Sequence, residues 1–100
     1  MTQAMRFAPE GELSIYCAAE QKVQLMQMLE QADVAELDLS KIGMLDSSGL
    51  QLLILAKQEA QRRQKPFSIV AASSAVTEVF ELCNLSGFFG QQEFIAGGQA

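Results

Sequence analysis

Short apolar segments alternate with amphipathic segments along this chain, and that order constrains the fold more than any other feature. Residues 34–39 and 67–71 are short, β-compatible and bounded by turn residues, which predicts strands. Apolar residues recur at three- and four-residue steps in residues 18–31 and from about 47 to 64, which predicts helices. Strands separated by helices are joined by right-handed crossovers, so we expect a partly parallel sheet.

A third helix and a last strand are expected near the C-terminal end. Ser73 and Ser74 are residue types that cap helices. The expected apolar face of that helix is formed by Val76, Val79, Phe80 and Cys83. The pairs Phe88-Phe89 and Phe94-Ile95 indicate one more short strand, followed by a flexible tail over residues 96–100.

The first two strands are expected to form an antiparallel hairpin. Residues 5–8 and 13–17 lean apolar and are separated by Pro9-Glu10-Gly11-Glu12, which is good turn chemistry. Leu13, Ile15 and Cys17 would then share one face. The predicted fold is therefore a single α/β domain over residues 1–100, with its core at about 5–95. Its sheet is mixed and mostly parallel, with an N-terminal hairpin and helices packed mainly on one face.

Within this frame, the pattern also assigns a core. The stripe of the first helix consists of Val23, Leu25, Met26, Leu29 and Ala32. Leu37 and Leu39 are expected to face the core from the strand at 34–39, and residues 40–46 are interpreted as a short connection before the second helix.

Composition excludes several classes of function. The net charge of −5, without a basic stripe, disfavours a nucleic-acid partner. The chain contains no histidine, which excludes a Ser-His-Asp triad, and it lacks the glycine patterns that hold nucleotide phosphates. Cys17 and Cys83 are expected to be reduced and packed as small hydrophobes. We predict a cytoplasmic, non-enzymatic protein without cofactor or metal and without direct membrane insertion.

The stretch Leu45-Asp46-Ser47-Ser48-Gly49-Leu50 joins small polar residues to the most apolar run in the chain. Asp and Ser cap the free N–H groups of a helix start, so ordinary capping explains much of this pattern. An aspartyl-phosphate site at Asp46 would require further acidic residues for magnesium after an earlier strand, and Cys17-Ala18-Ala19 provides none.

The same stretch, preceded by Leu37-Asp38-Leu39-Ser40, resembles the signature of STAS domains, the anti-sigma-factor antagonist family. A second region agrees with this resemblance. Ser73-Ser74-Ala75-Val76, Val79-Phe80-Glu81-Leu82 and Leu85-Ser86-Gly87-Phe88-Phe89 are similar to the third helix of the family and its following loop. The resemblance covers roughly residues 12–95.

The resemblance implies a switch between protein partners. In the sporulation-type antagonists, the serine after the aspartate is phosphorylated by a partner that is both a serine kinase with an ATP-binding domain and an anti-sigma factor. A separate phosphatase reverses the modification. Carried over, the acceptor is Ser47, with Ser48 as second choice. The implied partner-binding residues are Asp46, Ser47, Ser48, Gly49 and Leu50.

Two other readings of the resemblance stay open. The run Gly49-Leu50-Gln51-Leu52-Leu53 is similar to small stand-alone STAS proteins of chemotaxis systems. STAS subunits of lipid-transport ATPases would use the same surface as constitutive scaffolds without phosphorylation. A small enzyme or nucleotide-binding domain is a third possibility, which the missing glycine loop disfavours.

Overall fold

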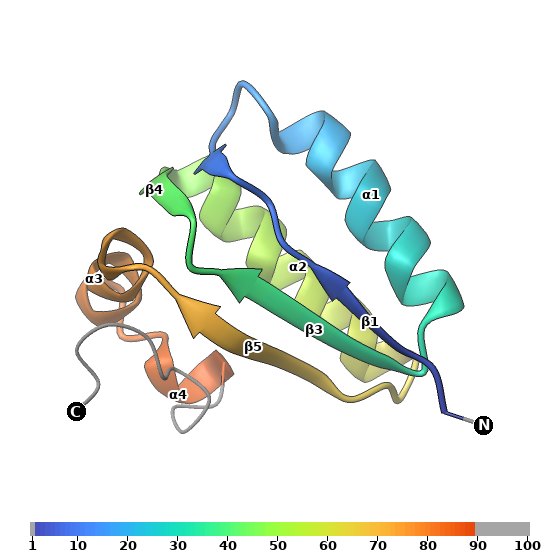
Figure 1. Cartoon of the computed structure of the whole chain (residues 1–100). Helices are drawn as coiled ribbons and strands as arrows, with labels where there is room; N and C mark the ends of the chain where they lie inside the picture. Colours follow the sequence, from blue (N-terminus) through green and yellow to red (C-terminus); the bar gives the residue numbers. More distant parts are fainter. Residues whose placement is uncertain (1, 90–100) are drawn as a thin grey trace.

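The computed structural model describes residues 2–89, which form five strands and four helices. The strands are β1 (Ala4–Phe7), β2 (Gly11–Leu13), β3 (Val34–Leu39), β4 (Ile42–Leu45) and β5 (Phe67–Ala72). The helices are α1 (Ala18–Gln31), α2 (Ser47–Arg62), α3 (Ser74–Leu82) and α4 (Ser86–Phe89). Figure 1 shows their arrangement along the chain.

All strand pairs within the described residues are parallel. β3 lies between β1 and β5 in a three-stranded sheet, and β2 pairs with β4 in a two-stranded one. In the chain, β1 is followed by β2, and its partner β3 is followed by β4. The parallel pair of β1 and β3 therefore continues into the parallel pair of β2 and β4. This arrangement brings the end of β2 next to the start of α2, where the candidate site lies.

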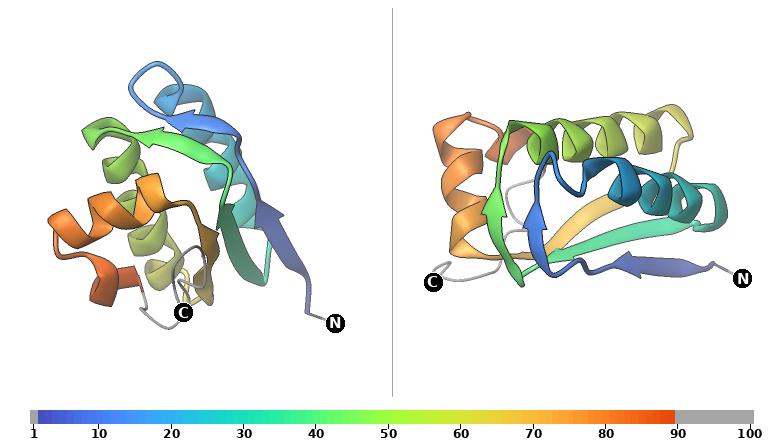
Figure 2. Two further views of the ribbon diagram at one scale, coloured as in Figure 1. Left: turned by 60° about the vertical axis from the view of Figure 1, so that its left-hand side comes forward. Right: turned by 90° about the horizontal axis from the view of Figure 1, so that it is seen from above.

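One face of the larger sheet is covered by α1 and α2, which lie side by side (Figure 2). The buried residues of β3 are Ala35, Leu37 and Leu39, in strict alternation with half-buried neighbours. This alternation follows from the two-residue period of a strand, which places every second side chain against the helices. Some side chains on the other face of the sheet are polar. Arg6 of β1 forms an ion pair with Glu36 of β3 at 3.0 Å.

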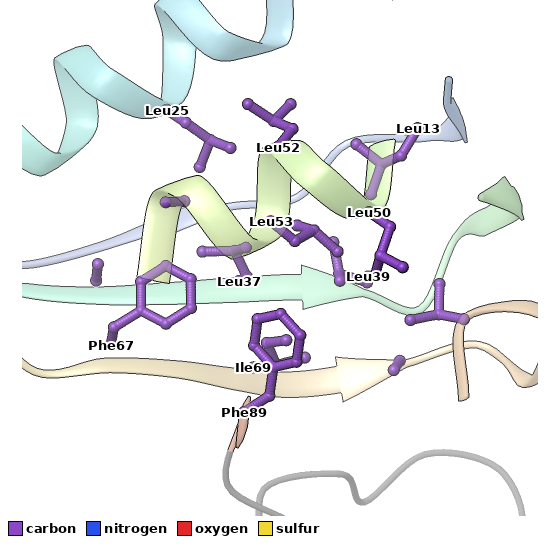
Figure 3. Close-up of a cluster of buried hydrophobic side chains, with 14 of the residues drawn as sticks. Leu13, Leu25, Leu37, Leu39, Leu50, Leu52, Leu53, Phe67, Ile69 and Phe89 are labelled. Carbon is purple, nitrogen blue, oxygen red and sulfur yellow. The ribbon is translucent and has the colours of Figure 1, made fainter. Parts of the chain in front are cut away.

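Leucine is the most common residue of the core. Figure 3 shows Leu25 of α1, Leu52 and Leu53 of α2, and Leu37 and Leu39 of β3 among the labelled core side chains. At the other end, Phe80 of α3 stacks on Phe89 of α4 with ring centroids 4.7 Å apart. Both rings are almost fully buried, so α3 and α4 close the end of the core that α1 and α2 leave open.

Several sequence predictions are confirmed. The parallel α/β domain with helices α1, α2 and α3 is observed, and β3 has the predicted bounds. Leu37 and Leu39 are fully buried as expected. Ser73 is the N-cap of α3, and its hydroxyl also donates to the backbone carbonyl of Ile42, which ties α3 to β4. Local caps and periodicity were therefore sufficient to locate these elements.

The predicted N-terminal hairpin is wrong. β1 and β2 do not pair with each other, since each pairs in parallel with a later strand. The segment Pro9-Glu10-Gly11 bends the chain without reversing it, and Gly11 has φ +93 at this bend. An isolated two-stranded hairpin is marginal in water, whereas pairing with β3 and β4 joins both strands to the buried sheet. Of the strand expected at 13–17, only Leu13 belongs to β2.

Other differences concern short or terminal segments. The expected connection at residues 40–46 contains β4, whose Ile42 and Leu45 are buried although they do not alternate with polar residues. Phe88 and Phe89 lie in α4 rather than in a strand. The pair Phe94-Ile95 and the tail over residues 96–100 lie outside the described residues.

The predicted burial is also wrong for single residues on the face of α1 and at the end of α3. Val23 is 56% exposed, and Gln21 is buried instead because its side-chain amide donates to the carbonyl of Glu12. Cys83 is exposed because it is the C-cap of α3 and lies beyond the buried stripe. Cys17, at the start of α1, is half-buried, and both cysteines are free thiols.

Candidate functional site

The candidate site lies at the N-terminus of α2, and Asp46 organises it. Asp46 is the N-cap of this helix, with one carboxylate oxygen accepting from the N–H of Gly49 at 2.9 Å. The other oxygen accepts from the N–H of Ile15 at 3.0 Å, in the turn between β2 and α1. A single aspartate therefore joins two segments that are 31 residues apart in the sequence.

Gly49 permits close packing of α2 against β2. A Cβ atom at this position would lie 2.1 Å from the carbonyl oxygen of Leu13 and 2.5 Å from its carbonyl carbon. Real Cβ atoms do not approach backbone atoms so closely, so only glycine fits here without a shift of the helix. The glycine of the motif thus serves the packing of the domain itself.

The five residues of the predicted site differ in exposure. Ser47 is exposed and Ser48 is half-buried, whereas Gly49 and Leu50 are buried against the domain. Asp46 is half-buried, with its carboxylate engaged as described. The structure therefore brings all five together at one helix end and leaves Ser47 the most accessible of them.

Sequence reasoning did not find the neighbouring turn. Ile15 is 66% exposed and Tyr16 is 87% exposed, although both are large and apolar. The turn is held at the start of α2 by the hydrogen bond that the N–H of Ile15 donates to Asp46, the residue before Ser47. This bond uses a backbone N–H, which every residue except proline carries, so no side-chain pattern signals it.

The charge of Asp46 is stabilised by this arrangement. Hydrogen bonds from the N–H of Gly49, and then from the N–H of Ile15, hold the pKa of Asp46 below its usual value. Because the folded-state pKa is lowered, the carboxylate stabilises the fold at pH values above the unfolded pKa. This stabilisation is lost as the pH falls through the lowered pKa.

We therefore expect the amide resonances of Gly49 and Ile15 to titrate together in an NMR experiment between about pH 2 and 6. Their common midpoint should lie below 3.8, the ordinary value for this carboxyl. Asp46→Asn should abolish the shared titration, while Asp38→Asn, which removes a carboxyl that accepts from Ser40, should leave it in place. A midpoint at or above the ordinary value would contradict the bonding described.

Neither of two other kinds of feature is found in the described part of the chain. Among residues 2–89, no helix is both long and apolar enough to cross a membrane. Within the same residues, no three His, Cys, Asp or Glu side chains are grouped as potential metal ligands.

Comparison with known proteins identifies the family. A family model described as "Mlab, STAS domain" matches residues 3–92, and the chain therefore belongs to the STAS domain family. STAS domains are in general non-catalytic binding modules, and the observed parallel α/β fold is theirs.

Three solved structures share this fold. The unphosphorylated anti-sigma factor antagonist SpoIIAA aligns with a TM-score of 0.74 at 16% identity, over 99% of this chain and 84% of that one. The STAS domain of a SulP transporter from Vibrio cholerae gives 0.70 at 20% identity, over 95% and 73%. A sulfate transporter family protein from Wolinella succinogenes gives 0.77 at 14% identity, over 91% and 75%. At these identities the likeness concerns the fold alone.

Proposed function

We propose that this chain is a non-catalytic partner switch, which binds a protein partner at the N-terminus of α2 and is controlled by phosphorylation of Ser47. The observation that carries the proposal is the exposure of Ser47 in the first turn of α2, beside buried Gly49 and Leu50. A kinase can reach this hydroxyl without unfolding the helix. Ser48 is half-buried and is the second choice.

The surroundings of Ser47 suit a surface that a phosphate would disrupt. The neighbouring Ile15 and Tyr16 are exposed and apolar, as in the centre of a protein interface. A phosphate would add a charge of about −1.5 to −2, for which a helix N-terminus compensates by roughly 0.3–1 kcal/mol. Ionised Asp46 stands next to it in the chain. The added negative charge and the Asp46 carboxylate repel each other.

The partners that the sequence resemblance implies complete the proposal. The first is a serine kinase with an ATP-binding domain that also acts as an anti-sigma factor, and the second is a phosphatase that resets the switch. The unmodified chain binds the kinase, and the phosphorylated chain releases it. We place this cycle in the cytoplasm, where ATP is available, and we assign no cofactor and no nucleic-acid partner to the chain.

The test begins with mass spectrometry of the protein from its own cells, to detect phosphate on Ser47. Quantitative affinity purification then compares Ser47→Ala with Ser47→Asp. We expect the aspartate variant to recover at least about tenfold less partner, equivalent to about 1.4 kcal/mol. Ser74→Asp is the matched control, since Ser74 is likewise the exposed first residue of a capped helix. This control should bind like the unchanged protein.

A constitutive scaffold subunit is the second candidate. Two of the three solved structures described above are a transporter STAS domain and a sulfate transporter family protein, which favours a subunit of a membrane-linked assembly. The lipid-transport ATPases and the chemotaxis systems named above are of this kind. Absence of phosphate, together with equal partner recovery by Ser47→Ala and Ser47→Asp, would support the scaffold and reject the switch.

A further inference from the structure

An open groove of about 360 Å³ runs between α1 and α2 and begins at the candidate site. On the α1 side, the small side chains of Ala18 and Ala19 leave room for an approaching group. On the α2 side, the groove starts at Ser48, the residue after the proposed acceptor. Figure 2 shows the two helices side by side. The lining is completed by Lys22, Gln51, Leu52, Ile54, Leu55 and Gln58.

Lys22 in this groove differs from the other basic side chains of the chain. It is exposed, and it forms no ion pair or hydrogen bond with any residue from 2 to 89. The remaining six are all engaged. Arg6 and Lys41 pair with glutamates, Arg62 and Arg63 share Glu59, Lys65 donates to backbone carbonyls, and Lys57 lies over the ring of Phe67.

Lys22 is the one charged residue among the described residues that line the groove. Ser48 of the first turn of α2 also lines the groove, and the Asp46 carboxylate that caps this turn offsets the partial positive charge of the helix end. The chain as a whole has a net charge of −5, so a groove that carries the free cation of Lys22 stands out locally. Charge complementarity therefore favours an anionic group at this place.

The rest of the lining is apolar or uncharged. Leu55 is 37% exposed, and Val23 on the neighbouring face of α1 is 56% exposed. A small inorganic anion would leave these side chains uncovered. An amphipathic helix could place apolar side chains on Leu55 and beside Ala18 and Ala19, while one carboxylate reaches Lys22.

We propose that the α1–α2 groove docks an acidic amphipathic helix of a protein partner, with a carboxylate of that helix paired to Lys22. The inference rests on the proposed binding function and names the chemistry of the partner. Docking of an acidic helix also explains how phosphorylation of Ser47 would release the partner. A phosphate on Ser47, adjacent to Ser48 at the start of the groove, repels the acidic helix and weakens its binding.

The experiment places the photocrosslinker p-benzoyl-phenylalanine at Gln58 of the full chain, in its own cells. Gln58 is exposed and lines the groove, so the probe reaches a docked segment without entering the core. We expect a cross-link to a partner peptide that carries acidic residues at helical spacing beside apolar ones. Lys22→Glu should reduce the cross-link at least fivefold, and Lys22→Arg should retain it because the charge is kept.

Lys41→Glu is the control for a general effect of lowered positive charge, since Lys41 is exposed and paired with Glu10 outside the groove. It should leave the cross-link unchanged. A cross-linked peptide without acidic residues, or a cross-link insensitive to Lys22→Glu, overturns the proposal, as does the absence of any cross-link. If partner recovery still depends on Ser47 in that case, the groove assignment fails and the switch stands. If the cross-link depends on Lys22 but not on Ser47, the groove assignment stands and the switch fails.

Discussion

Gly49→Ala should destabilise the domain by about 2 kcal/mol, measured by urea unfolding of the purified chain. The added Cβ would lie 2.1 Å from the carbonyl oxygen of Leu13, so α2 must move away from β2. Overpacking of this kind typically costs about 1–3 kcal/mol, and a rigid backbone neighbour places the site at the upper end. The better helix propensity of alanine, about 1 kcal/mol, offsets only part of the strain.

Gly43→Ala is the matched control for this substitution. Its Cβ would meet only the carbonyl oxygen of Gly11, at an ordinary contact distance of 3.7 Å. We expect its free energy of unfolding to stay within about 0.5 kcal/mol of the unchanged protein. Equal stability of Gly49→Ala and Gly43→Ala would show that α2 and β2 do not approach each other as described.

The result also separates two roles for the motif glycine. If the glycine served only a partner's approach, its replacement would weaken binding and leave stability intact. The geometry instead predicts a loss of stability in the isolated chain, because Gly49 is buried against Leu13. Partner contact is then left to the exposed surface that includes Ser47, Ile15 and Tyr16.

Phe80→Ala should cost about 3–5 kcal/mol, the usual range for removal of a buried aromatic ring. Phe80 is 1% exposed and stacks on Phe89, so its loss leaves a cavity between α3, α4 and the sheet. A domain of this size is stabilised by only about 5–15 kcal/mol, so a large part of its stability depends on this end. Urea unfolding monitored by circular dichroism measures the effect.

Leu82→Ala on the same helix tests whether that cost comes from burial. Leu82 is 86% exposed, so we expect a change within about 0.5 kcal/mol. If Phe80→Ala were equally mild, α3 and α4 would not belong to the core. The pair therefore tests whether the closing helices are an integral part of the domain.

The candidate site was predicted in part from local residues. Asp46 and Ser47 were placed at a helix start because their residue types satisfy free N–H groups, and the structure has this helix begin at Ser47. The role of Gly49 needed the position of Leu13, which is 36 residues earlier in the chain. Lys22 had no signal in the sequence, because its lack of an internal partner depends on where every glutamate and aspartate lies in the fold.

The sequence by itself determined the features that depend on neighbours along the chain. These are the periods of α1 and α2, the caps Asp46 and Ser73, and the strict alternation of β3. Their physical causes are hydrogen bonds and side-chain faces within a few residues, so the local pattern is sufficient.

Only the tertiary structure decided which strands pair and which apolar residues stay exposed. The short strands β1, β2 and β4 have weak patterns of their own, and their parallel pairing depends on partners about 30 residues away. The same holds for Ile15, which is held at the surface by a hydrogen bond to Asp46. Such choices are set by competition for burial across the whole domain, which no single segment encodes.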